Sequence, residues 1–273
     1  HTSFDSPAER LAAINSELVE LIPDDDGIIV LENAIGREGY GILHALEDPF
    51  TKPKKSTSLR FKNANVYKAL ARGEGSELYA AGDTVQRFDG KKWSAVPVAT
   101  GYALRIRNMA TNGTTTVAVG DTGTIVELAK GKVKALVKGT NTSVFFNGVH
   151  VAEDGTISVA GNGGQALQGK PGKLRPLPGL DPDTVVGGCA EYRGLVYWSA
   201  CGKDGGLHVA RGGQLANVFD GLNCFGLTAT RDFLFVETEE GLLRFDGKAS
   251  KRLKTKYDAA KGVWAVAPTK AKI

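Results

Sequence analysis

A glycine that recurs at a nearly constant interval is the feature that most constrains how this chain can fold. Three of the intervals are 41 residues and the last is 34, at Gly90, Gly131, Gly172, Gly213 and Gly247. Each of these glycines ends a segment with the same order of elements: a short apolar strand, a first turn, a second short apolar strand and a second turn. The pentapeptide Arg-Phe-Asp-Gly-Lys occurs twice, at 87–91 and 244–248. The chain is therefore an internal repeat of short strands.

A repeat of about 40 residues with several strands per unit is typical of a β-propeller. A leading strand precedes the first turn of each unit, so we expect five complete blades between residues 62 and 258. A further strand at 262–268 has nothing after it, and residues 27–61 hold three strands. Pairing these two segments would close the ring and remove open sheet edges. The sequence thus predicts an all-β propeller of six four-stranded blades, with a composite closing blade built from 27–61 and 262–268.

The N-terminal segment has a different pattern, so we divide the chain into an extension at 1–26 and a propeller at 27–273. Ser6, Pro7 and Glu9 have the order of a helix N-cap, a first-turn proline and a capping-box glutamate. Apolar residues then follow at helical spacing, at Leu11, Ile14, Leu18 and Leu21. We expect a short N-terminal helix.

Composition fits a folded protein outside the membrane. Hydrophobic residues make up 42% of the chain and charged residues 23%, which is enough to bury a core. No run of about 18 apolar residues marks a membrane span, and the first residues lack the pattern of a signal peptide. We expect a soluble, monomeric, cytoplasmic protein, with a periplasmic location as the alternative if a leader has been removed.

The repeat carries a family likeness. The segment 78–93, with its Leu-Tyr-Ala-Ala-Gly-Asp and Arg-Phe-Asp-Gly-Lys-Lys-Trp, resembles the Gly-Asp blade repeats of bacterial propellers of the BNR-like and photosystem-assembly-factor-like kind. The segment 119–125 is similar to the same repeat, and the likeness extends over residues 62–253. The resemblance implies a propeller fold. The functions it implies range over assembly factors, surface-exposed binding lipoproteins, sialidases and immunity proteins that block toxins.

The residues do not support a catalytic function such as that of a sialidase. The segment 153–156 is similar to a sialidase Asp-box, but it lies in the first hairpin turn, and the leading strands offer only Arg105 and Arg107 toward a carboxylate-binding triad. His44, His150 and His208 show no metal-ligand spacing. We therefore expect no catalytic residue, no metal and no cofactor. The alternative is a metal-dependent hydrolase or lactonase-like enzyme, with carboxylates at the channel mouth holding an ion.

Acidic and amide residues follow the second strand of successive units, and propeller geometry would gather these loops on one face. Favoured turn chemistry explains Gly-Asp and Gly-Asn equally well. The longest loops should lie on the same face and add aromatic residues, which anchor protein interfaces. The predicted partner-binding face consists of Arg37, Glu38, Asp83, Tyr102, Asp121, Phe145, Phe146, Asn162, Asp204, Glu239 and Glu240.

The opposite set of turns is rich in lysine, but no aromatic stacking pattern accompanies it, so we do not expect a nucleic-acid partner. Cys189, Cys201 and Cys224 should lie toward the acidic face. A disulfide from Cys224 to Cys201 or to Cys189 and three free thiols both remain open.

These features predict a non-catalytic bacterial propeller that binds a protein. The concrete forms we expect are an immunity or inhibitor protein that neutralises a toxin or effector domain, or an assembly or scaffold factor. An acidic, aromatic face would suit the blocking of a basic active site such as that of a nuclease.

Overall fold

The structure is a computed structural model, and it describes residues 16–24, 27–34, 40–47, 56–62, 67–97, 105–136, 143–258 and 263–270. The chain divides into two compact units, His1–Ala135 and Leu136–Ile273, which we call unit 1 and unit 2. In the described residues no helix has the length and apolar character needed to cross a membrane.

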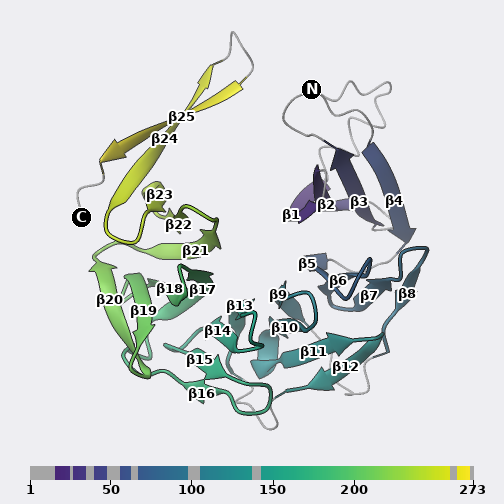
Figure 1. The fold of residues 1–273 in the computed structure, drawn as a ribbon, viewed down its shortest axis with the longest axis horizontal. Coiled ribbons are helices and arrows are strands. Elements are labelled where there is room, and N and C mark those ends of the chain that lie inside the picture. The colour runs from purple at the N-terminus through teal and green to yellow at the C-terminus, as the bar shows by residue number, and fades with distance from the viewer. Residues whose placement is uncertain are drawn as a thin grey trace. The chain divides into compact units, whose positions relative to one another are not determined.

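Every sheet in both units is an antiparallel meander in which strands pair in chain order (Figure 1). The described residues of unit 1 form three four-stranded sheets. Their strands are β1 (Ser16–Asp24), β2 (Gly27–Ala34), β3 (Tyr40–Glu47) and β4 (Ser56–Lys62); β5 (Tyr67–Arg72), β6 (Leu78–Gly82), β7 (Val85–Phe88) and β8 (Trp93–Ala95); and β9 (Ile106–Thr111), β10 (Thr116–Gly120), β11 (Ile125–Ala129) and β12 (Lys132–Ala135). A short 3₁₀ turn, η1 (Asp121–Gly123), follows β10.

Unit 2 contains two four-stranded sheets and one five-stranded sheet. Their strands are β13 (Phe146–Val151), β14 (Ile157–Gly161), β15 (Ala166–Gly169) and β16 (Arg175–Pro176); β17 (Val185–Tyr192), β18 (Leu195–Cys201), β19 (Gly206–Arg211) and β20 (Gln214–Asp220); and β21 (Cys224–Ala229), β22 (Leu234–Thr238), β23 (Gly241–Phe245), β24 (Ser250–Asp258) and β25 (Val263–Lys270).

The predicted repeat is confirmed as a series of antiparallel sheets, and its glycines are turn residues. Gly90, Gly131, Gly172, Gly213 and Gly247 all have positive φ, between 72° and 93°. The two Arg-Phe-Asp-Gly-Lys segments form the same turn. Asp89 Oδ1 accepts hydrogen bonds from the amides of Lys91 and Lys92, and Asp246 Oδ1 accepts from those of Lys248 and Ala249. The Asp side chain and the left-handed glycine together specify the turn.

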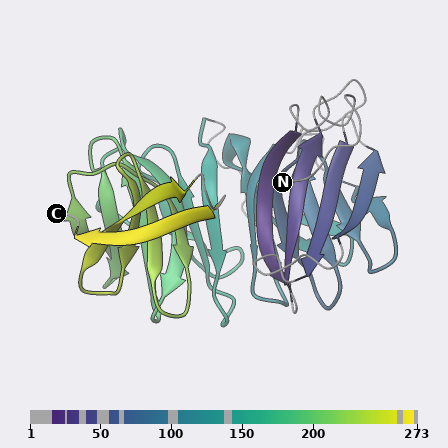
Figure 2. The same cartoon turned by 90° about the horizontal axis from the view of Figure 1, so that it is seen from above.

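Two expectations for the chain ends were wrong. Residues 16–21, expected in the N-terminal helix, belong to strand β1, which pairs with β2, and the rest of that predicted helix lies outside the described residues. The strand expected at 262–268 to complete an N-terminal blade is β25, which instead pairs with β24 from Lys251↔Lys270 to Asp258↔Val263. Figure 2 shows the four strands β1–β4 side by side and β24 and β25 forming a long hairpin. In place of six four-stranded sheets, the described residues form five sheets of four strands and one of five.

A β-bulge recurs near the start of the first strand in the five sheets from β5 onward. At each bulge the pairing register between the first and second strands shifts across one residue. These residues are Lys68, Arg107, Asn147, Gly187 and Phe225. At Gly187 a side chain would not fit, since a Cβ there would overlap the backbone carbonyl of Phe225 on the neighbouring sheet. The bulges therefore allow the first strands of adjacent sheets to approach closely.

Apolar side chains fill the space between neighbouring sheets. In unit 2, Tyr197 packs edge-on against Phe245 at a centroid distance of 5.8 Å, within a cluster that includes Leu207, Leu234 and Val236. On its other face the β17–β20 sheet buries Trp198 against Ala160 and Ala166. The β17–β20 sheet thus has two buried faces, which matches the continuous apolar run of its second strand.

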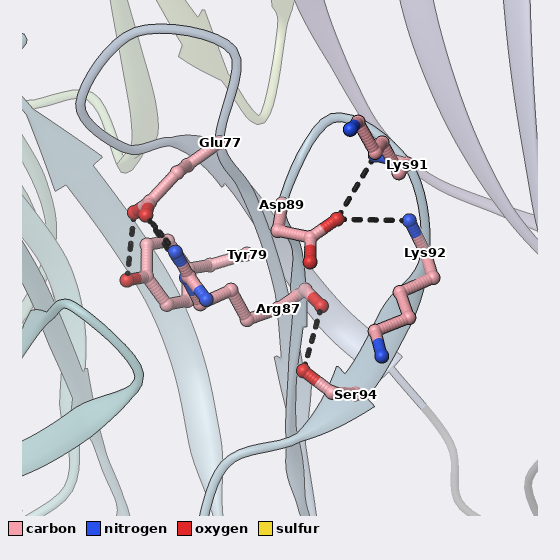
Figure 3. A network of polar contacts seen from close by, with 7 residues as sticks. All are labelled: Glu77, Tyr79, Arg87, Asp89, Lys91, Lys92 and Ser94. Carbon is pink, nitrogen blue, oxygen red and sulfur yellow. Dashed lines mark hydrogen bonds and ion pairs between the residues drawn. The ribbon is translucent and has the colours of Figure 1, made fainter.

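In unit 1, polar side chains also connect neighbouring parts of the repeat, as Figure 3 shows for Glu77, Tyr79 and Arg87. The Glu77 carboxylate lies between the Tyr79 hydroxyl, which donates to it at 3.1 Å, and the guanidinium of Arg87. Tyr79 also accepts a hydrogen bond from the backbone amide of Gly131. The network therefore joins the β5–β8 sheet to the turn between β11 and β12.

Candidate functional site

A cleft of about 740 Å³ opens at one end of the two last sheets of unit 2. Its lining includes the β18–β19 turn at 202–205, the β20–β21 connection at 221–223 and Glu239, which follows β22. Residues of β19 and β20 and Gly179 complete the lining. In an antiparallel meander these connections lie at the same end of the strands. We call this end of the strands the cleft end of unit 2. The opposite end, which carries the β17–β18, β19–β20 and β21–β22 turns, is the distal end.

Asp204 is held on one wall of the cleft by hydrogen bonds. Its Oδ2 accepts from the backbone amide of Asp181 at 2.6 Å and from Oγ1 of Thr184 at 3.1 Å, and its carbonyl accepts from Nε2 of His208 at 2.9 Å. His208 is 4% exposed and also lines the cleft. Because a carbonyl oxygen can only accept, Nε2 carries a proton and is the donor in this hydrogen bond.

Glu239 forms the opposite wall through Asn223. Its Oε1 accepts from the Asn223 backbone amide at 3.1 Å and its Oε2 from the Asn223 side-chain amide at 2.8 Å. These two bonds hold the pKa of the Glu239 carboxyl below its usual value, so the group is ionised at neutral pH. Asn223 also accepts from the amide of Gly202 at 2.9 Å, which connects both walls.

The remaining charges make the cleft acidic. Asp220 is exposed and its side chain has no hydrogen-bond or ion-pair partner. Lys203 is the one cation among the lining residues, and its Nζ is 2.7 Å from Oδ2 of Asp181. With Asp204, Asp220 and Glu239 against one lysine that is already paired, the cleft presents a net negative surface.

The structure brings two of the predicted face residues, Asp204 and Glu239, into this cleft. Asp83 and Asp121 belong to unit 1, where Asp83 is exposed and Asp121 forms an ion pair with the bulge residue Arg107. Glu240 follows Glu239 but pairs with Arg252. Arg37, Glu38 and Tyr102 lie outside the described residues.

Two other predicted residues have structural contacts. Oδ1 of Asn162 accepts from Nδ2 of the bulge residue Asn147 at 2.9 Å, and the Asn162 amide donates to the Phe145 carbonyl. Phe146, expected as an exposed aromatic anchor, is instead buried, with 3% of its surface exposed. Its ring lies over Gly161, where a Cβ would come within 2.7 Å of the ring. The missing side chain of the glycine therefore creates the space that Phe146 fills.

The register also corrects the equivalence of the repeats. In four sheets, the predicted residue comes directly after the second-strand residue that pairs just before the bulge. These residues are Asp83, Asp121, Asn162 and Glu239. In the β17–β20 sheet the residue at this position is Cys201, not Asp204. Asp204 lies three residues later, in the turn. The sequence did not show which residue of this sheet is equivalent to the others, because the first strand of the β17–β20 sheet has one more paired residue, Val185, before its bulge.

Sequence reasoning missed most of the cleft. Lys203 and Asn223 occur in short connections without a recognisable motif, and Asp220 is the last residue of β20. His208 was considered only as a possible metal ligand. The signal that was available is the density of glycine and charge at 202–206 and 220–223. Neither segment contains enough apolar residues to form the interior of a strand.

The other candidate groups are accounted for by local contacts. His150 Nε2 lies 3.3 Å from Oε2 of Glu191 on the neighbouring first strand. Cys189, Cys201 and Cys224 are free thiols. Cys189 and Cys224 belong to the clusters on opposite faces of the β17–β20 sheet, which separates them. Within the described ranges, no three His, Cys, Asp or Glu side chains are grouped as metal ligands.

Comparisons with known proteins give the fold. No protein-family model matches the chain, and no curated protein matches it. Among solved structures it is similar to YCF48 bound to D1 peptide, with a TM-score of 0.58 and 11% identity over 93% of each chain. It is also similar to a chain of the nidogen/laminin complex, with a TM-score of 0.52 and 13% identity over 77% of this chain and 86% of that one.

A third similar structure is the extracellular domain of a putative hybrid two component system from B. thetaiotaomicron. The TM-score is 0.55 at 12% identity, and the match covers 89% of this chain but 39% of that one. These propeller-like neighbours and the antiparallel four-stranded sheets agree with a β-propeller fold. At this level of identity the likeness extends to the fold alone.

Proposed function

We propose that this chain is a non-catalytic protein-binding propeller whose partner docks on the cleft end of unit 2. The observation that carries the proposal is the acidic cleft itself, an open concavity of about 740 Å³ lined by loop segments and by residues of β19 and β20. Loops on a sheet scaffold are common positions for binding residues. The polar groups on the walls suit recognition of a charged or polar partner surface better than enclosure of an apolar small molecule.

The walls are already ordered, which favours binding. Asp204, Glu239 and Asn223 are held by hydrogen bonds from their neighbours, so a partner does not have to immobilise them. Side chains that are fixed before association lose less conformational entropy on binding. Their negative charge would also steer a basic partner toward this end.

The similar structures add support from fold-level analogy. YCF48 was solved bound to D1 peptide, and another neighbour is part of the nidogen/laminin complex. We therefore favour a protein or peptide partner for this chain as well. The specific forms that we propose are an immunity or inhibitor protein that covers the basic active site of a toxin, or an assembly or scaffold factor.

The enzymatic alternative has weaker support. A lactonase-like hydrolase would need several carboxylates converging on one ion at about 2.3–2.6 Å. Asp121 and Glu240 are paired with Arg107 and Arg252 instead, and the cleft carboxylates are bonded to different neighbours. We propose a binding role for this reason.

Affinity capture with paired charge reversals tests the proposal. Asp220→Lys changes an exposed, unpartnered side chain in the cleft, and Asp232→Lys makes the same change in the β21–β22 turn at the distal end. We expect a protein retained from a native lysate by the wild type and by Asp232→Lys to be lost with Asp220→Lys. Retention of the same protein by both variants, or its loss with both, would place the binding surface elsewhere.

A further inference from the structure

Cys201 and Cys224 lie on facing surfaces of the two last sheets of unit 2. Cys224, the first residue of β21, belongs to the apolar cluster between these sheets, together with Tyr197 of β18. Side chains alternate between the two faces along a strand. The bulge in the β17–β18 pair lies on β17, so the alternation holds along β18 and puts Cys201, four residues after Tyr197, on the same face. Both cysteines therefore face the space between the β17–β20 and β21–β25 sheets.

The two cysteines also lie at the same level along their strands. Gly202 follows Cys201 and Asn223 precedes Cys224. The Gly202 amide donates a hydrogen bond to Oδ1 of Asn223 at 2.9 Å. Burial is the main cause that raises the pKa of Cys224 to about 12, and the nearby Cys201 thiol contributes to the increase. Cysteines whose neighbours are joined in this way can reach the short Cα separation of a disulfide with little backbone movement.

Cys189, the third cysteine of the chain, faces away from this space. It belongs to the cluster on the opposite face of the β17–β20 sheet, with Trp198, and its Sγ donates to the Ser158 carbonyl at 3.2 Å. The sheet itself separates Cys189 from Cys224. Of the two pairings of Cys224 that the sequence leaves open, the fold therefore favours the one with Cys201.

Both thiols are reduced in the structure, and each donates one weak hydrogen bond. Sγ of Cys201 donates to the Val185 carbonyl at 3.5 Å, and Sγ of Cys224 donates to the Leu222 carbonyl at 3.4 Å. Because S–H is a weak donor, turning the two side chains toward each other gives up little. Cys201 is partly exposed whereas Cys224 is buried, so an oxidant in solution meets Cys201 first.

We infer that Cys201 and Cys224 are a redox-active pair that forms an intramolecular disulfide when the protein is exposed to a disulfide oxidant. With oxidised glutathione, the Cys201 thiolate attacks one sulfur, forms a mixed disulfide and releases one glutathione thiolate. The Cys224 thiolate then attacks the Cys201 sulfur, which breaks the mixed disulfide and releases the second glutathione. Two protein thiols are oxidised, one glutathione disulfide is reduced, and the two protons pass from the cysteines to the released glutathione thiolates.

The disulfide would join two loop segments of the cleft end. Cys201 directly precedes the turn at 202–205, and Cys224 directly follows the connection at 221–223. Oxidation would therefore add a covalent link beside the hydrogen bond between Gly202 and Asn223. This inference concerns thiol chemistry and does not depend on the proposed function, because it requires no protein partner.

Peptide mapping after oxidation tests the inference. The reduced, full-length protein is kept native at about pH 8 with oxidised glutathione, and the remaining thiols are then alkylated with N-ethylmaleimide during unfolding. Trypsin, which cuts after lysine and arginine except before proline, leaves the three cysteines in separate peptides: 174–193 for Cys189, 194–203 for Cys201 and 212–231 for Cys224. We expect peptide 194–203 to be linked to 212–231, and peptide 174–193 to be alkylated.

Oxidation of the protein unfolded in urea shows whether the native fold selects the pair. In an unfolded chain the cysteines closest in sequence, Cys189 and Cys201, have the lowest entropic cost of loop closure, so their peptides should be linked most often. The native protein should instead give the link between Cys201 and Cys224. The same distribution of links in both states would contradict the inference.

Two serine variants provide matched controls. Cys189→Ser should form the same link as the wild type, and Cys201→Ser should form no intramolecular disulfide, because the sheet separates the thiols that remain. The wild-type map identifies the pair by itself, so the test does not depend on the folding of either variant. Three alkylated thiols in the oxidised native protein, a glutathione adduct that persists on Cys201, or a disulfide between two copies of the chain would overturn the inference.

Discussion

Single charged side chains tie neighbouring parts of the repeat together, and Glu77 is the best-defined case. Its carboxylate accepts from Arg87 and from Tyr79, whose hydroxyl also contacts the amide of Gly131 (Figure 3). The Glu77 and Arg87 side chains are only 16% and 25% exposed. An ion pair with this burial contributes more than a fully solvated one.

The hydrogen bond from Arg87 holds the pKa of the Glu77 carboxyl below its usual value of 4.5. Folding therefore lowers this pKa, so the stabilisation is present above the unfolded value and is lost as pH falls through the folded one. We expect Glu77→Gln to lower the free energy of unfolding by about 1 kcal/mol at pH 7. The difference from the wild type should shrink below about pH 4 in urea titrations. Glu74→Gln, at an exposed site three residues earlier, should show neither effect; a pH-independent difference for Glu77→Gln would contradict the ion-pair account.

The three thiols should differ in reactivity, because they differ in burial. Burial raises the pKa of all three, that of Cys224 to about 12, and Cys201 is the one that retains partial exposure. In the native protein at pH 8 we expect an aromatic disulfide reagent to modify Cys201 first and the other two only on unfolding. Cys201→Ser should remove the fast phase. Fewer than three titratable thiols in the unfolded, unreduced protein would show that a disulfide had formed.

At the scale of elements, local turn chemistry was predictable and long-range pairing was not. Asp89 and Asp246 specify their turns through their own side chains, so the repeat and its strand order followed from the sequence. For β1, the spacing of Leu18 and Leu21 fits a helix, but Val19 and Ile22 suit a strand equally, and pairing with β2 decided the outcome. Pro23 is tolerated there because β1 is an edge strand.

The prediction for the last strand, β25, was wrong for a related reason. Ring closure required β25 to pair far along the chain, whereas a hairpin with β24 forms across a short connection between Asp258 and Val263. A local hairpin costs less loop-closure entropy than a pairing between chain ends. The candidate cleft was equally hard to predict, because its acceptors come from three connections whose contact depends on the packing of adjacent sheets.

The bulges give the sharpest test at this scale. Gly187→Ala would place a Cβ against the backbone of Phe225, whereas at the neighbouring Gly188 the nearest atom would be 3.6 Å away. Backbone is less able than a flexible side chain to move aside, so we expect Gly187→Ala to destabilise the protein by at least about 2 kcal/mol. Gly188→Ala should cost less than about 1 kcal/mol. Urea unfolding of the two variants measures the difference, and similar values would mean that the close approach of the strands is not required.

For the molecule as a whole, the ends of the unit 2 sheets differ in charge. Asp204, Asp220 and Glu239 lie at the cleft end. The distal end is mixed in charge: Lys170, Lys173, Arg211 and Lys248 lie in or beside its turns, together with Asp154, Asp232 and Asp246. The formal net charge of +4 therefore conceals an acidic surface. This difference would orient a basic partner toward the cleft end before contact, an effect that weakens as salt increases.

Exposed apolar side chains bear on whether copies of the chain associate. Among the described residues, three large hydrophobic side chains are more than a third exposed, namely Leu195, Phe225 and Leu242. Stable self-association buries a large apolar surface, so among the described residues these three side chains are where a contact between copies would be tested first. We expect light scattering after size exclusion to give 28.9 kDa, independent of protein concentration.

Phe225→Ser and Leu242→Ser make that expectation specific. Both residues belong to the β21–β25 sheet, so a dimer held by this sheet should dissociate when either is replaced. Leu195→Ser, in a different sheet, is the control. For a monomer all three variants keep the wild-type mass. A doubled mass in the wild type that returns to 28.9 kDa with Phe225→Ser and Leu242→Ser, but not with Leu195→Ser, would replace the monomer by a dimer formed through that sheet.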